Sequence, residues 1–300
     1  MDSRQHRWTG GRRVRAAIGL LLAIAFCVQC HQLAVTDAPE TTARIERAPS
    51  NVAYASIREP KLSGDHFEAM AQSNPMELLR TALDRYERSV HDYVCTFTKQ
   101  ELVNGRLTAE QVTHVKFRDE PFSVNMYWTK NADKAQRVIY VEGKWTDKNG
   151  QKLALVEPAG AIARLLVTHV MRPIDGAEAK ATARRQIDQF GFENSLRLIL
   201  KYCELAAPRK ELNLKYVGQG SVSDRPTYVL ERRLPYTGDD GRYPDRVLVI
   251  HLDKEYLYPT CCVAYADDEK QVLLGRYVLT DVKFNVGLTD KDFAPQETTK

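Results

Sequence analysis

The clearest apolar pattern in the chain lies between residues 194 and 207. Asn194 is a suitable helix N-cap, and Pro208 is expected to end the helix. One apolar stripe at helical spacing is formed by Leu196, Ile199, Leu200, Cys203 and Ala207. A second stripe is formed by Leu198, Tyr202 and Leu205, and the narrow polar edge by Arg197, Lys201 and Glu204. Because this helix has two apolar sides, we expect a sheet against one and a second helix or a bound apolar ligand against the other.

A second predicted helix begins at Asn74. An asparagine cap, Pro75 at the first helical position and Glu77 in the first turn form its start signal. Its single apolar face is formed by Met76, Leu79, Leu83, Tyr86 and Val90. We therefore expect it to be covered on one side only.

Between and after these helices the apolar period changes from 3.6 to 2, which is typical of strands. Before the central helix the predicted strands are 93–98, 111–117, 122–129, 136–142 and 153–156, and after it 212–217, 226–234, 247–252, 261–265 and 272–284. Turns are predicted at 104–105, 218–220, 238–241 and 267–269. Segment 161–171 fits a helix or a strand, and we favour a strand. The pattern predicts an α+β fold: a large, curved antiparallel sheet of about ten strands with helices on one face.

The most regular strand, 122–129, places large apolar side chains on one of its faces. Ordinary core packing explains any one of them. Together with the second stripe of the helix, they could instead leave an apolar cavity between sheet and helix. The candidate ligand-binding residues are Phe97, Phe122, Met126, Trp128 and Tyr140 on the sheet and Leu198, Tyr202 and Leu205 on the helix.

Charge identifies the start of the chain as distinct from the rest. Five arginines against Asp2 give residues 1–36 a charge of +4, which equals the net charge of all 300 residues. The remainder is formally neutral, so the basic balance does not favour nucleic-acid binding. The apolar run 16–28 is shorter than the roughly 20 residues of a membrane span, so residues 1–36 are predicted to be a cleaved export signal.

The predicted organisation after the signal is a flexible linker at 37–73, a folded domain at 74–296 and a disordered tail at 297–300. Four cysteines, Cys95, Cys203, Cys261 and Cys262, would remain after cleavage, and three disulfide pairings are open. The alternative for Cys95 and Cys203 is that they are small buried apolar groups on apolar stripes, which we favour for Cys203 because its helical position explains it.

One motif suggests a cofactor: Cys27-Val28-Gln29-Cys30-His31 matches the C-x-x-C-H pattern of covalent haem attachment. It begins inside the export signal, so we expect no haem. The sequence contains no nucleophile elbow, phosphate loop, dinucleotide fingerprint or zinc-protease motif. Its histidines have no metal-ligand spacing, so we expect no metal, no cofactor and no catalytic residues.

Three blocks in the second half carry a resemblance. Residues 228–231, 249–254 and above all 281–293 resemble strand blocks of outer-membrane lipoprotein carrier-like (LolA/LolB-like) domains, closest to an uncharacterised branch of exported proteins, over residues 75–295. The resemblance implies a half-barrel with helices packed on its concave face, whose apolar side holds acyl chains.

The sequence and this resemblance lead to three hypotheses. The first is a monomeric, non-enzymatic protein of the periplasm or cell envelope of a Gram-negative-type bacterium, which binds an apolar ligand such as a lipid or a lipidated protein. The second is an envelope structural or interaction module with a filled core. The third is an enzyme, which would require a cleft that gathers His114, His169 or His251 with carboxylates.

Overall fold

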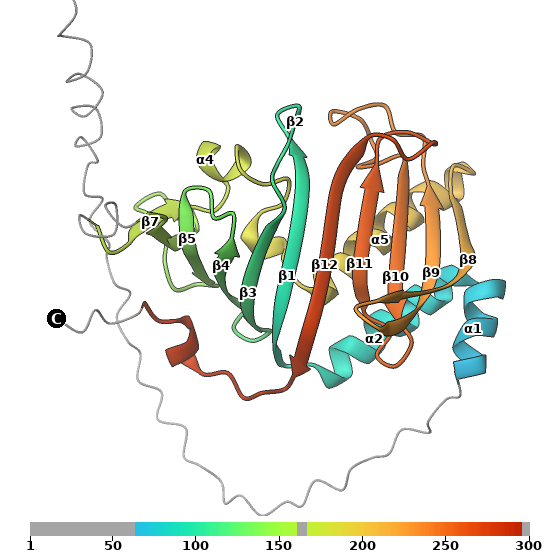
Figure 1. Cartoon of the computed structure of the whole chain (residues 1–300), viewed down its shortest axis with the longest axis horizontal. Coiled ribbons are helices and arrows are strands. Elements are labelled where there is room, and N and C mark those ends of the chain that lie inside the picture. Colours follow the sequence, from blue (N-terminus) through green and yellow to red (C-terminus); the bar gives the residue numbers. More distant parts are fainter. Residues whose placement is uncertain (1–63, 161–166, 296–300) are drawn as a thin grey trace, which may run out of the picture.

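The computed structural model describes residues 64–160 and 167–295, which form one large sheet and a small group of helices (Figure 1). Within these residues the sheet has twelve strands, and all neighbouring strands are antiparallel. They are β1 (Asp92–Val103), β2 (Arg106–Leu107), β3 (Gln111–Arg118), β4 (Ser123–Lys130), β5 (Ala135–Val141), β6 (Leu153–Pro158), β7 (Val170–Pro173), β8 (Asn213–Val222), β9 (Arg225–Arg233), β10 (Val247–Asp253), β11 (Pro259–Tyr265) and β12 (Leu273–Phe284). The α+β prediction is confirmed: the ten expected strands are present, together with the short strand β2 and with β7, which begins at the end of segment 161–171.

The strand order joins two antiparallel meanders through one long pair. Along the sheet it is β7-β6-β5-β4-β3-β1-β12-β11-β10-β9-β8, with β2 paired only to β1. The β1–β12 pair runs from Tyr93 opposite Phe284 to Glu101 opposite Gly275. The sheet is therefore open, with β7 and β8 at its edges, and the two halves meet at β1 and β12.

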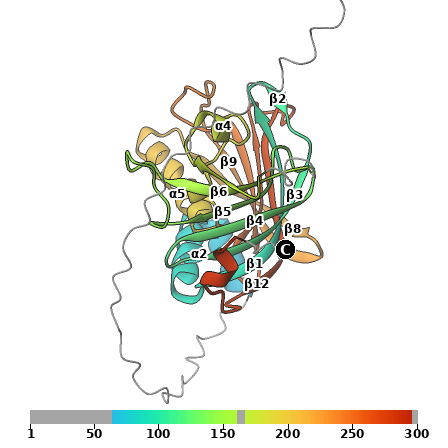
Figure 2. The ribbon, with the colours of Figure 1, turned by 90° about the vertical axis from the view of Figure 1, so that its left-hand side faces the viewer.

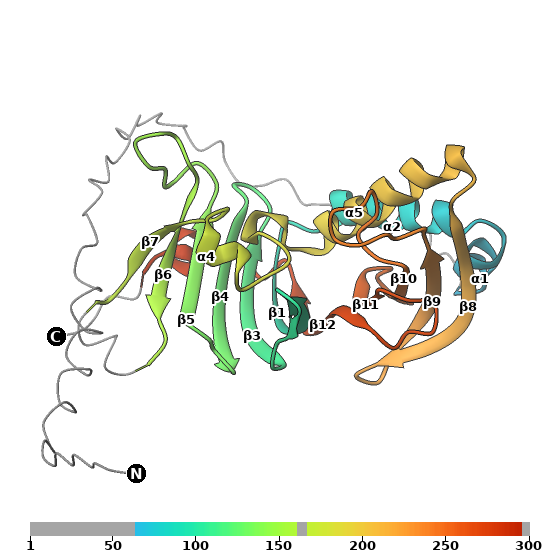
Figure 3. The ribbon, with the colours of Figure 1, turned by 90° about the horizontal axis from the view of Figure 1, so that it is seen from above.

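Helices α1 (Gly64–Ser73), α2 (Pro75–Ser89) and α5 (Phe192–Ala206) lie on one face, over the β8–β11 half (Figures 1 and 3). The β4–β7 end of the sheet curls toward the same side, so the helices lie on the concave face (Figure 2). A buried core joins these helices to β9 and β10 and contains Phe67, Leu78, Leu79, Ala82, Leu196, Ile199, Leu200, Cys203, Tyr228, Leu230, Leu248, Ile250 and Leu252. Four residues of the first stripe of α5 thus pack on the sheet as predicted, whereas Ala207 is exposed, and α2 packs beside α5.

The predicted N-cap of the central helix is wrong by three residues. Gly191, with φ of 116°, precedes the helix, which begins at Phe192. The Asn194 side chain donates instead to the carbonyl oxygen of Phe190 at 3.0 Å. Gly191 is the N-cap because its positive φ favours glycine, whereas the sequence pattern favours an asparagine at this place. Ala207 belongs to the following 3-10 turn, η3 (Ala207–Arg209).

The predicted linker 37–73 is wrong at its end, because residues 64–73 form α1. Phe67 and Ala71 are buried in the helix–sheet core, and these two apolar anchors are too few for a periodic pattern to stand out in the sequence. The Asn74 side chain accepts from the backbone nitrogen of Glu77, so the predicted cap marks a second helix, α2, of the same domain. Residues 1–63 and 296–300, with the export signal, the rest of the linker and the predicted tail, lie outside the described residues.

The predicted turn at 218–220 is also wrong. Strand β8 continues to Val222, and Gly218 lies at a bulge in its pairing with β9. The chain turns instead at Ser223 and Asp224, both with positive φ. Glycine in a strand often marks a bulge, which explains why the turn signal misled. The predicted turn at Asn104 and Gly105 is confirmed between β1 and β2.

Segment 161–171 is only partly described. Residues 161–166 lie outside the described residues, and residues 167–169 are not in a strand. Only Val170 and Met171 of this segment belong to β7, so the strand that we favoured is confirmed at its end alone. Of the helices within the described ranges, none is long and apolar enough to cross a membrane.

Residues 286–295, the C-terminal strap, run from the end of β12 past the lower ends of β1 and β3 (Figure 1), and the 3-10 turn η4 (Asp290–Phe293) contacts β4 and β5. The Asp92 carboxylate of β1 accepts hydrogen bonds from the backbone nitrogens of Val286 at 2.6 Å, Gly287 at 3.1 Å and Leu288 at 3.0 Å. Farther along the strap, Phe293 is fully buried in a cluster with Ile139, Val141 and Leu155. The strap therefore forms the outer layer of this half of the sheet.

We predict that Phe293→Ala lowers the free energy of unfolding by about 3–5 kcal/mol, because it leaves a cavity in this outer cluster. Urea unfolding of the full chain measures the change. Val286→Ala, in the same strap but 44% exposed, is the matched control and should change stability by less than about 0.5 kcal/mol. A loss for Phe293→Ala as small as that for Val286→Ala would show that the strap is not part of the core.

Candidate ligand-binding cavity

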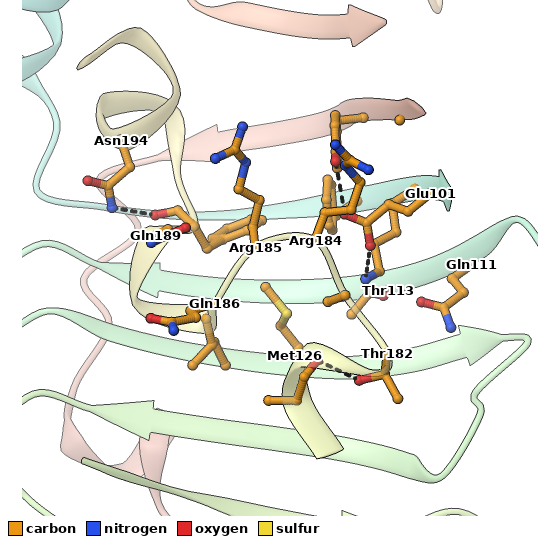
Figure 4. A pocket seen from close by; sticks show the side chains of 18 of the residues that line it. Glu101, Gln111, Thr113, Met126, Thr182, Arg184, Arg185, Gln186, Gln189 and Asn194 are labelled. Atoms are coloured by element: carbon orange, nitrogen blue, oxygen red, sulfur yellow. Dashed lines mark hydrogen bonds and ion pairs between the residues drawn. The ribbon is translucent and has the colours of Figure 1, made fainter. Parts of the chain in front are cut away.

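The helices leave half of the concave face without helical cover. Over β1 and β3–β6 the face is covered instead by residues 174–191, which include the single turn α4 (Ala177–Lys180) and η2 (Ile187–Gln189). Few large apolar side chains are available in this segment to fill the space below it. A cavity of about 600 Å³ lies between the sheet, this segment and α5 (Figure 4).

The cavity has an extended apolar wall. The sheet contributes Phe97, Met126, Trp128, Val138, Ala154, Val156 and Leu279, and the covering elements contribute Ile174, Ile187, Phe190, Leu198, Ile199 and Tyr202. The alternation of β4 places Met126 and Trp128 on the same face as predicted. The second stripe of α5 is split: Leu198 and Tyr202 face the cavity, while its last residue does not.

Five of the eight candidate residues line the cavity: Phe97, Met126, Trp128, Leu198 and Tyr202. The structure brings these five together; that they bind a ligand stays a prediction. Three others lie outside the lining, and each is occupied by protein contacts.

Phe122 precedes β4 and packs edge-on against Phe117, with ring centroids 5.3 Å apart. Tyr140 is only 1% exposed and lies in a cluster with Ala154 and Ile174. Leu205 is at the far end of α5 and packs beside Leu234 and Tyr243, outside the cavity. In each case the side chain is covered by residues from elsewhere in the sequence. The strand or helix period does not reveal such neighbours.

The cavity also has a polar end, which sequence reasoning missed. The Lys99 ammonium lies 2.8 Å from a Glu101 carboxylate oxygen, and the other oxygen accepts from the Tyr277 hydroxyl at 2.9 Å. The Glu101 side chain is 2% exposed. Burial, and then the Glu101 charge, raise the pKa of Tyr277, so its hydroxyl stays protonated as the donor.

Gly275 makes room for this contact. A Cβ atom on Gly275 would lie 2.6 Å from the Tyr277 hydroxyl oxygen, so a larger residue would displace the phenol that reaches Glu101. A signal for the polar end was present in the sequence: Phe97, Lys99 and Glu101 alternate and therefore share one face of β1. Only the aromatic member of this series, Phe97, is among the predicted ligand-binding residues.

Two arginines stand at the rim of the polar end (Figure 4). Arg184 binds Asp239, with Nη2 2.9 Å from Oδ1, and its Nη1 donates to the Leu102 carbonyl oxygen at 3.2 Å. Arg185 is exposed and forms no hydrogen bond or ion pair with any described residue. The side chains of Gln186 and Gln189 lie along the same segment.

A buried ion pair closes the end of the cavity near β9. The Arg232 guanidinium binds both carboxylate oxygens of Asp245, at 3.0 and 2.9 Å, and donates to the Ile199 carbonyl oxygen of α5 at 3.3 Å. Both side chains are almost fully buried. The pair therefore ties α5 to the sheet, and its charges cancel.

The cysteines and histidines do not form a reactive site in the cavity. All four described cysteines are free thiols, and Cys203 is fully buried, as predicted. Burial raises the pKa of each thiol, which makes it a poor nucleophile. His114, His169 and His251 lie outside the cavity lining, so the cleft required by the enzyme hypothesis does not form there.

The sequence matches one family model, that of DUF1571, a family described as proteins of unknown function, over residues 90–299. The chain belongs to the DUF1571 family. The match covers the sheet, the cavity and the C-terminal strap. No curated protein sequence matches the chain.

Solved structures similar to this DUF1571 chain include the following three. MucB has 17% identity and a TM-score of 0.44, covering 75% of this chain and 64% of MucB, so the chain spans less than two thirds of that protein. The lipoprotein LppX of Mycobacterium tuberculosis has 10% identity and a TM-score of 0.38, covering 72% and 99%. A putative outer membrane lipoprotein-sorting protein domain from Vibrio parahaemolyticus has 13% identity and a TM-score of 0.34, covering 73% and 95%.

The open antiparallel sheet with helices on its concave face is the architecture that the resemblance implied. With TM-scores below 0.5, these likenesses carry no information on ligand or partner.

In this DUF1571 chain we predict that the two stripes of α5 differ in their contribution to stability. Leu200→Ala should lower the free energy of unfolding by about 2–5 kcal/mol, because the Leu200 side chain of α5 is buried against α2 and the sheet. Leu198→Ala should cost about 1 kcal/mol or less, since Leu198 borders the cavity and is only half-buried. Chemical denaturation monitored by circular dichroism compares the two variants. Equal losses would make both stripes ordinary core.

Proposed function

We propose that this DUF1571 protein binds a single apolar or amphipathic ligand, such as a lipid or the acyl chain of a lipidated protein, in the cavity between the sheet and α5. The supporting observation is the cavity itself, about 600 Å³ with an apolar wall drawn from both layers. Its size falls within the roughly 300–1,000 Å³ of pockets that hold one small ligand. We propose no catalytic step.

The construction of the wall supports binding of an acyl chain. The helical cover ends partway across the sheet, and short, irregular elements cover the remainder. Water in such a space would wet Phe97, Met126 and Leu198, whereas a hydrocarbon chain would remove their surface from water. Met126 is unbranched and flexible, which lets the wall adapt to chains of different shape.

The place of action is proposed from the start of the chain. Residues 1–36 have the basic, apolar and polar parts of an export signal. We therefore place the protein in the periplasm or cell envelope, where lipids and lipidated proteins are available as ligands. The alternative, an interaction module of the envelope, would require the cavity to be filled by its own side chains.

We predict that the full chain, freed of lipid, binds the uncharged fluorophore N-phenyl-1-naphthylamine saturably. Leu198→Trp should weaken binding about tenfold or more, because the indole would occupy the cavity. Fluorescence titration measures the affinity.

The matched control is Leu205→Trp, on the same helical stripe but outside the cavity, which should leave affinity within about twofold. Circular dichroism checks that both variants fold. No saturable uptake by folded wild-type protein would reject the proposed function and favour the interaction module.

A further inference from the structure

The charges at the polar end of the cavity do not balance. Three cations, Lys99, Arg184 and Arg185, stand against two carboxylates, those of Glu101 and Asp239. Lys99 is paired with Glu101 and Arg184 with Asp239. The charge of Arg185 is therefore left without a partner among the described residues.

The other charges of the lining cancel locally. Arg172 pairs with Glu178 at 3.1 Å, and the buried Arg232 pairs with Asp245 at 2.9 Å. Asp133 and Lys134 are adjacent in the chain, between β4 and β5, and offset each other. The uncompensated positive charge of the cavity is thus concentrated at one place, the rim beside Arg184.

Arg185 is close enough to the polar end to act on it. Its charge lowers the pKa of Tyr277, against the raising effect of burial, and Arg184 acts in the same direction. Figure 4 shows Arg185 between Gln189 and Arg184, with its guanidinium turned away from Met126. The cavity consequently has an apolar end at Met126 and a cationic end at the two arginines.

We infer that the ligand is an anionic amphiphile, whose carboxylate or phosphate head group is bound by Arg185 while its hydrocarbon chain occupies the apolar end. A guanidinium presents paired donors that match either head group. This inference rests on the proposed function and narrows its ligand class. The acyl groups of a lipidated protein are joined through uncharged amides and esters, so the inference favours a free anionic lipid.

Displacement of N-phenyl-1-naphthylamine from the full chain tests this. The competitors share one chain length: palmitate and palmitoyl lysophosphatidate are anionic, and monopalmitoylglycerol is uncharged. The wild type should bind the anionic lipids about threefold to fivefold more tightly than the uncharged one, because an exposed ion pair contributes about 1 kcal/mol or less. Arg185→Gln should abolish this preference and leave the affinity for monopalmitoylglycerol unchanged.

Lys180→Gln is the matched control, because Lys180 is an exposed cation of the same segment outside the cavity lining, and it should keep the preference. Inorganic phosphate alone is tested as a further competitor. If phosphate competes with lysophosphatidate but does not displace the fluorophore, and binds about as tightly as lysophosphatidate, the rim binds a free anion. That result would overturn the inference.

The outcomes separate the two proposals. If the fluorophore does not bind, the proposed function fails and the inference fails with it. If the fluorophore binds but the wild type treats anionic and uncharged lipids alike, or Arg185→Gln keeps the preference, only the anionic head group is refuted.

Discussion

The structure depends on the pairing of β1 with β12, the longest strands of the sheet. Each begins one meander of the sheet order, so without this pair the β3–β7 and β8–β11 halves would have no common edge. The pair also brings Glu101 within reach of Tyr277, although 176 positions separate them in the chain. At its other end it places the strap that follows β12 against Asp92. The polar end of the cavity and the outer cover thus follow from one strand register.

The cavity arises because the two halves are covered differently. Helices α2 and α5 supply a continuous apolar layer over β9 and β10, and there the core is filled. Over β3–β6 the cover is a short helical turn, a 3-10 turn and loops, which cannot offer side chains at a regular spacing. Helix α5 lies at the boundary, so one of its stripes is core and part of the other is cavity wall.

Periodicity predicted most of this fold because each element buries one face. The alternation through Met126 and Trp128 identified the wall, and the stripes of α5 identified its cover. Features set by partners distant in sequence were not predictable in this way. Phe122 and Leu205 have the right period but are covered by Phe117 and Tyr243. Gly218 has turn chemistry but serves a bulge, and Lys99 and Glu101 became a buried pair only through the register with β12.

The two ends of the cavity contribute differently to binding. The Lys99–Glu101 pair is neutral in sum and hydrogen-bonded by Tyr277, so the alkyl stem of Lys99 can extend the apolar wall. Arg185 is exposed, and an exposed ion pair in water is worth only about 0–1 kcal/mol on its own. Once the hydrocarbon chain is seated, however, the head group is held beside the guanidinium at high effective concentration. Burial of the chain therefore supplies most of the affinity, and the rim arginine selects among ligands whose chains fit equally well.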